Sequence, residues 1–158
     1  MDYCITEYPL QKFLRRGGYG HFVKTERFVE DEFDYDSRNE ENTRSLEETP
    51  YFMLLYIFQT VKPDLEDEYT DAFLEQDEIR AVIKLLADYK SKLETCKTQD
   101  DYINFCKERY TEYFVGNMKR EFANWTIMVD LLKGITQDII DFFQEALSEN
   151  KFIYVVGD

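Results

Sequence analysis

The stretch TQDIIDFFQEALSENKFIYVV (136–156) decides the fold class of this chain, because its hydrophobic period changes part-way along it. In its first part, Ile139, Phe143 and Leu147 recur every four residues, which is the spacing of one apolar helix face. Residues 151–156 then form a run rich in β-branched and aromatic side chains, which favours an extended backbone. Because a single strand cannot satisfy its own backbone N–H and C=O groups, this tail predicts a partner strand elsewhere.

The best partner candidate is the segment 21–29, which is rich in Phe, Val and Thr. We therefore predict a mainly α protein, a bundle of about five helices with a small antiparallel sheet formed by N-terminal and C-terminal strands (α+β). A chain of 158 residues fits a single domain, 1–158. Within it we expect three regions: a mixed strand and turn region with an acidic loop at 30–48, a helical bundle, and a terminal strand. Their bounds are 1–49, 50–150 and 151–156.

Helix starts and stops divide the bundle. Thr49-Pro50 and the capping-box pattern that begins at Thr98 predict two helix starts. A third predicted helix begins at Asp64 and carries an apolar stripe to Leu93, with a possible break near residue 76. Further helix ends or breaks are expected at Gly116 and at Lys133-Gly134, followed by a new start at Thr136.

The negative charge is concentrated in two short segments. The chain has 33 acidic and 19 basic residues, a formal net charge of -14. Residues 26–48 hold ten acids and three bases, and residues 62–78 hold eight acids and one base, so each segment contributes -7. Such a charge distribution attracts basic partners and repels nucleic acid and anionic lipid. We therefore expect a basic protein partner, with no direct nucleic-acid binding and no membrane association.

The acidic segment 62–78 contains carboxylates at helical spacing. On a continuous helix they would form one face opposite the apolar stripe. Four helical residues rise about 6 Å, a step broadly similar to the spacing of phosphates along a DNA strand. The row therefore predicts a partner-binding face that imitates phosphates, and the alternative is an ordinary solvated helix face. Its members are Asp64, Asp67, Asp71, Glu75 and Glu78.

The second acidic segment alternates acids with aromatic rings. Such a segment can dock on a basic surface while its rings insert into pockets, and the alternative is a mobile polar loop. Its candidate partner-binding residues are Asp31, Glu32, Phe33, Asp34, Tyr35 and Asp36. Only the first two ligand positions of an EF-hand loop are matched here, so we predict no calcium site.

No catalytic, cofactor-binding or metal-ligating motif is present. His21 is the only histidine, and Cys4, Cys96 and Cys106 form no C-x-x-C pair. A Cys/His pair could arise only through the fold, and Cys96 and Cys106 fit core positions better. The odd cysteine count, the lack of a signal-peptide pattern and the shortness of the apolar runs favour the cytoplasm.

Three functions from different classes are compatible with these observations. The first is a non-catalytic acidic protein that inhibits a basic, nucleic-acid-binding partner by imitating phosphates, as anti-restriction and anti-CRISPR proteins do. The second is an immunity or antitoxin-like protein that neutralises a toxic enzyme. The third is a small metal-dependent enzyme whose site is assembled from scattered carboxylates. The charge pattern favours the first, so the sequence predicts a binding protein and not an enzyme.

Overall fold

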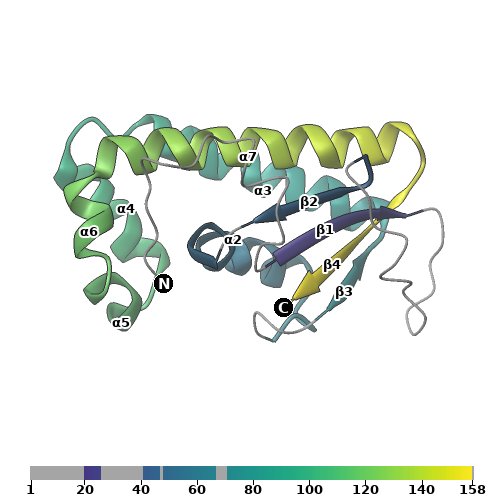
Figure 1. The fold of residues 1–158 in the computed structure, drawn as a ribbon, viewed down its shortest axis with the longest axis horizontal. Coiled ribbons are helices and arrows are strands. Elements are labelled where there is room, and N and C mark those ends of the chain that lie inside the picture. Colours follow the sequence, from purple (N-terminus) through teal and green to yellow (C-terminus); the bar gives the residue numbers. More distant parts are fainter. Residues whose placement is uncertain (1–19, 26–40, 47, 67–70, 158) are drawn as a thin grey trace.

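The structure is a computed structural model and describes residues 20–25, 41–46, 48–66 and 71–157 (Figure 1). Within them the chain forms four strands and six helices, which confirms the predicted class of a mainly α protein with a small antiparallel sheet. The strands are β1 (Gly20–Thr25), β2 (Thr43–Leu46), β3 (Ala72–Leu74) and β4 (Phe152–Gly157). The helices are α2 (Glu48–Val61), α3 (Gln76–Glu94), α4 (Gln99–Arg109), α5 (Glu112–Gly116), α6 (Lys119–Ala123) and α7 (Trp125–Ser148).

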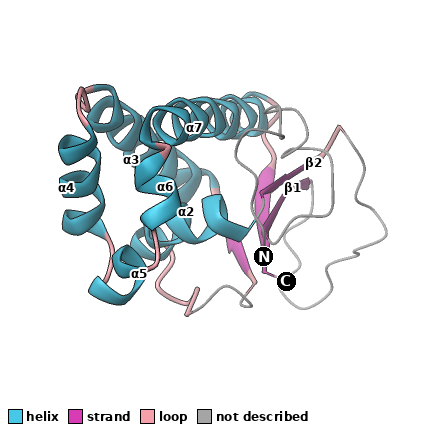
Figure 2. Cartoon of the chain, turned by 60° about the vertical axis from the view of Figure 1, so that its left-hand side comes forward, coloured by secondary structure: helices cyan, strands magenta, loops and turns pink. Residues whose placement is uncertain are grey.

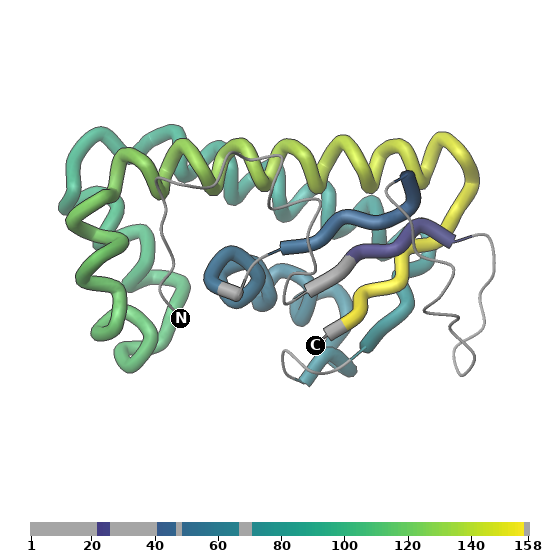
Figure 3. Tube along the Cα trace, viewed as in Figure 1, coloured from purple at the N-terminus to yellow at the C-terminus, as the bar shows by residue number. Residues whose placement is uncertain are grey.

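The sheet has the strand order β2-β1-β4-β3, and all its neighbours are antiparallel. The predicted pairing of the first and last strands is confirmed, because β1 and β4 lie side by side at its centre (Figure 3). Phe22 of β1 is opposite Val155 of β4, and Phe73 of β3 is opposite Tyr154. The terminal strand thus obtains hydrogen-bonding partners on both of its edges.

Two of the strands were not predicted. β2 lies inside the segment 30–48, which we expected to be an irregular loop, and β3 lies inside the predicted helix that starts at residue 64. Both are short edge strands whose conformation depends on pairing with β1 and β4, respectively. Local propensity carries little information about such strands, because what stabilises them is cross-strand packing and burial.

The described helices lie on one side of the sheet (Figure 2). Successive strand residues point to opposite faces, so Ile153 and Val155 join the large core beneath the helices. Tyr154 and Val156 point the other way and join a second, smaller cluster with Val23. Both faces of β4 are therefore buried, which explains why its sequence is continuously apolar rather than alternating.

The longest helix runs through the predicted stop. α7 continues from Trp125 to Ser148 without a break, so the expected helix end at Lys133-Gly134 and the expected new start at Thr136 are wrong. The fully buried hydroxyl of Thr136 donates to the backbone carbonyl of Leu132 at 2.6 Å, a bond made inside a helix and not at its cap. Glycine inside a helix costs about 1 kcal/mol, which the apolar face of α7 outweighs by packing along α3.

Other predicted boundaries are confirmed. The helix expected from Thr49 is present as α2, although it begins at Glu48 and Thr49 is helical and not its cap; α5 ends at Gly116 as expected. The capping box before α4 is present, because the Thr98 hydroxyl accepts from the Asp101 backbone N–H at 3.1 Å and the Asp101 carboxylate accepts from that of Thr98 at 3.1 Å. These features depend on neighbouring residues alone, so short stretches of sequence are enough to predict them.

Candidate functional site

The acidic segment 62–78 connects α2 to α3 and is not one helix. Residues 62–66 leave α2 through a turn in which the Leu65 N–H donates to the Lys62 carbonyl at 3.0 Å. Leu65 is buried in the core and anchors this turn. Pro63 disfavours helical backbone at the residue before it, which ends α2. After residues that lie outside the described part, the chain forms β3 and then enters α3 at Gln76.

The predicted row of carboxylates on one helix face is therefore wrong as a geometry. Asp64 lies in the turn after α2, Asp71 precedes β3, and Glu75 precedes α3 as its N-cap. Only Glu78 is helical, in the first turn of α3. Asp67 lies outside the described residues. The break expected near residue 76 is where α3 begins, so the helical stripe is confirmed only from that point onward.

Two of these carboxylates have structural partners. Asp71 accepts a hydrogen bond from the Tyr154 hydroxyl at 3.2 Å, which links the start of β3 to β4. Glu78 forms an ion pair with Lys62 at 3.2 Å and accepts from the Glu75 backbone N–H at 3.0 Å. Glu78 thus caps α3 and neutralises the one base of the segment.

Four carboxylates in the described part of this segment are exposed, and we call them the β3 acidic rim: Asp64, Glu66, Glu75 and Asp77. Asp64 and Glu66 precede β3 in the chain, and Glu75 and Asp77 follow it. The Asp77 side chain is 98% exposed, although Arg80 lies 2.8 Å from it in a surface ion pair. Glu66 and Asp77 were missing from the predicted site because they do not fit the helical spacing. Their membership in the -7 segment was the signal that could have found them.

The second predicted site lies outside the described residues. Asp31, Glu32, Phe33, Asp34, Tyr35 and Asp36 belong to the segment 26–40, so the structure does not test their proposed role. The described continuation of that segment is β2, where the Arg44 guanidinium lies 4.7 Å from the centre of the Phe142 ring. One of the three bases in the segment 26–48 is therefore packed against α7.

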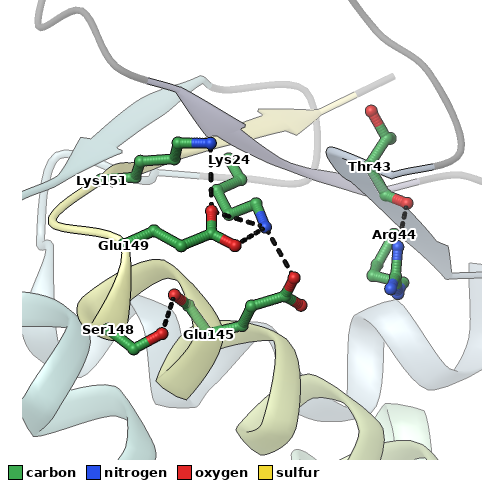
Figure 4. A network of polar contacts seen from close by, with 7 residues as sticks. All are labelled: Lys24, Thr43, Arg44, Glu145, Ser148, Glu149 and Lys151. Atoms are coloured by element: carbon green, nitrogen blue, oxygen red, sulfur yellow. Dashed lines mark hydrogen bonds and ion pairs between the residues drawn. The ribbon is translucent and has the colours of Figure 1, made fainter.

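A buried lysine forms the most extensive charge network among the described residues (Figure 4). The Lys24 ammonium lies 2.9 Å from carboxylate oxygens of both Glu145 and Glu149, and Lys151 lies 3.0 Å from Glu149. The Lys24 side chain is only 5% exposed. Burial lowers the pKa of Lys24, but its hydrogen bonds to the two glutamates more than offset this, so the pKa is raised. The network ties β1 to the end of α7.

This network predicts a loss of stability in acid. Hydrogen bonds from Lys24 and Lys151 lower the pKa of Glu149 from 4.5 to about 2. A carboxylate whose pKa is lowered by folding stabilises the protein fully above its unfolded pKa and loses this contribution as the pH falls toward its folded pKa. We expect the urea midpoint to fall between about pH 5 and pH 2. In Glu149→Gln that fall should be smaller, and an unchanged pH profile would contradict the assignment.

The two described cysteines have structural environments. Cys96 and Cys106 are buried, and burial raises the pKa of both thiols, that of Cys106 to about 12. Such thiols stay protonated at neutral pH and lack the thiolate character of a nucleophile. Cys4 lies outside the described residues, and His21 lies in β1. Among the described residues, no group of three or more His, Cys, Asp and Glu side chains is arranged to hold a metal ion.

Comparison with known proteins gives no relatives: no protein family, no curated protein and no solved structure matches this chain. None of the described helices combines the length and the apolar character that a membrane crossing requires.

Proposed function

We propose that this chain is a non-catalytic acidic protein that binds and inhibits a basic, nucleic-acid-binding partner protein. The observation that supports this is the β3 acidic rim, defined above, whose four carboxylates are exposed and lie on either side of one short edge strand in the sequence. The described part of the segment 62–78 holds six acids and one base, a net charge of -5. That base, Lys62, is already paired with Glu78.

The corrected geometry changes the proposed mechanism. The rim carboxylates project from a turn and a helix start, so they do not reproduce the regular spacing of phosphates. What they supply is a concentrated negative field, which steers association with a basic surface and selects against acidic partners. Inhibition then results from occupation of the partner's nucleic-acid-binding surface. We place this activity in the cytoplasm, where buried free thiols such as Cys106 remain reduced.

The same charges are also compatible with a different role. Exposed acids beside an edge strand prevent it from pairing with strands of other molecules. The proposal therefore requires a measurement that separates binding from solubility. The triple variant Asp64→Asn/Glu75→Gln/Asp77→Asn changes the net charge from -14 to -11, since each substitution removes one negative charge. A matched control, Asp100→Asn/Glu112→Gln/Asp130→Asn, removes three exposed charges from α4, α5 and α7.

The immobilised protein is expected to retain a basic partner from nuclease-treated lysate at low salt and to release it when duplex DNA is added. We expect the rim variant to bind this partner roughly tenfold more weakly, because several interfacial charges are lost together. The control variant should bind within about twofold of the natural chain, since its charges lie elsewhere. Equal weakening in both variants would show that only net charge matters. If duplex DNA does not release the bound partner, the target is not the partner's nucleic-acid-binding surface.

A further inference from the structure

A groove lies where α2, α3 and the end of α4 meet, and its volume is about 350 Å³. This is within the range of small-molecule sites, which span roughly 300–1,000 Å³. The groove is distinct from the β3 acidic rim, so a ligand bound there is independent of the proposed function. Its walls combine apolar, hydroxyl-bearing and charged side chains, among them Tyr56, Leu85, Asp88, Tyr89, Lys92 and Arg109.

The Arg109 guanidinium is held rigidly at one wall of this groove. It lies 3.9 Å from the centre of the Phe105 ring and donates to the Phe105 backbone carbonyl at 2.8 Å. Its side chain is only 12% exposed. Arginine at the last residue of α4 is also favoured by the negative end of the helix dipole. A fixed planar guanidinium loses little entropy when it binds a carboxylate, so it is preorganised for this purpose.

Arg109 has more hydrogen-bond donors than its contacts with other described residues use. A guanidinium carries five N–H donors. Among the described residues, the Arg109 guanidinium donates to the Phe105 carbonyl and forms an ion pair with the carboxylate of Glu108. The ion pair with Glu108 is 3.6 Å long, and the Glu108 side chain is 74% exposed, so a ligand can displace it at little cost.

The remaining walls match the other parts of a small acid. Lys92 contributes a second cation at the rim, half exposed and 3.1 Å from Asp88. Tyr56 and Leu85, which are only partly buried, contribute apolar surface. The Tyr89 hydroxyl is bonded to that of Tyr110 at 3.1 Å, so this polar group belongs to the protein's own network. The hydrogen-bond donors available to a ligand are therefore those of Arg109 and Lys92, and the groove also has apolar surface.

We propose that this groove binds a small organic carboxylate, whose acid group is held by Arg109 and whose apolar part rests on Tyr56 and Leu85. Lys92 strengthens the binding as a second, solvent-exposed cation. Three contributions therefore define the ligand: a planar anion for the guanidinium fork, an apolar body, and a size that the groove accommodates.

The test uses sodium phenylacetate as the probe and two-dimensional amide NMR of the full chain as the readout. We expect saturable shifts of the amides in the last two turns of α3 and at the end of α4. Three comparison compounds define the chemistry at equal ionic strength. Neutral 2-phenylethanol should bind at least about fivefold more weakly, because it lacks the carboxylate. Sodium phosphate and sodium chloride should leave these amides unshifted, because they lack the apolar body.

Variants assign the carboxylate contact to its residues. Arg109→Lys keeps the charge but removes the fork, and it should weaken phenylacetate binding at least about tenfold. The matched control Arg120→Lys changes an exposed arginine of α6 and should bind as the natural chain does. If Arg109→Lys fails to fold, Lys92→Gln still tests the site, because its half-exposed side chain is not needed for the core. That variant should bind several-fold more weakly.

The proposal has definite failures. Absence of saturable shifts with phenylacetate overturns it, as does equal affinity for 2-phenylethanol, which would make the groove merely apolar. Shifts caused equally by phosphate would reassign the site to inorganic anions. Equal binding by the natural chain and either groove variant would show that the carboxylate does not bind where we place it. None of these outcomes bears on the β3 acidic rim, whose variants should bind phenylacetate normally.

Discussion

Replacing Phe143 with alanine is expected to lower the free energy of unfolding by about 3–5 kcal/mol, the usual cost of removing a large aromatic side chain from a core. Phe143 of α7 is fully buried. Its ring lies 5.6 Å from that of Phe22 in β1, in an edge-to-face arrangement, and 6.2 Å from that of Phe58 in α2. This one side chain thus links α7, β1 and α2. Its removal leaves a cavity that three elements cannot close together.

The measurement is equilibrium urea unfolding followed by circular dichroism, and the control is Tyr113→Ala. Tyr113 in α5 is 84% exposed, so its replacement should change the unfolding free energy by no more than about 0.5 kcal/mol. A loss of less than about 1 kcal/mol in Phe143→Ala would contradict the packing of α7 against the sheet. A large loss in the control would show that α5 packs against something else in solution.

The second large effect is expected when the partners of the buried lysine are removed. In Glu145→Gln/Glu149→Gln the Lys24 ammonium stays in a site where its side chain is 5% exposed, without either opposing charge. We expect the unfolding temperature to fall by at least about 5 °C, since an uncompensated buried charge is strongly destabilising. The Phe142 ring, 5.7 Å from the ammonium, compensates only in part.

The reverse change should cost less. In Lys24→Met the apolar stem is kept and no cation is buried, while the two glutamate side chains are 47% and 34% exposed and can be hydrated. Glu149 also keeps its contact with Lys151. A control, Glu94→Gln/Asp130→Asn, removes the same amount of charge from surface ion pairs and should change the unfolding temperature little. An equal effect of Lys24→Met and the double glutamate variant would show that Lys24 is not buried as described.

The candidate sites show where inference from sequence ends. The concentration of charge in the segment 62–78 can be read from the sequence alone, because it does not depend on the fold. Where each carboxylate points does depend on the fold, because Asp71 contacts Tyr154, 83 positions along the chain, and Glu78 contacts Lys62. The groove around Arg109 could not be predicted from the sequence. It forms only where three helices meet, and each helix contributes only two to four residues to it.

What the sequence by itself determined is local. The apolar face of the last helix, the start of α2 near Thr49, the capping box at Thr98 and the extended tail at 151–156 each depend on residues within a few positions of one another. The interactions that stabilise each of these features lie within one helix or strand. The pairing of the tail with β1 could be predicted from the same information, because a buried strand requires a partner and few candidates exist.

What only the tertiary structure decided depends on contacts distant in the sequence. Ala72–Leu74 is a strand because β4 offers it a ladder and a buried face, although the pattern around it favours a helix. Gly134 stays helical because burial of the apolar faces on both sides of it, packed along α3, outweighs its low helix propensity. The physical reason is the same in both cases: burial against a distant element contributes more free energy than the propensity of a few residues, and a single sequence does not state which element that will be.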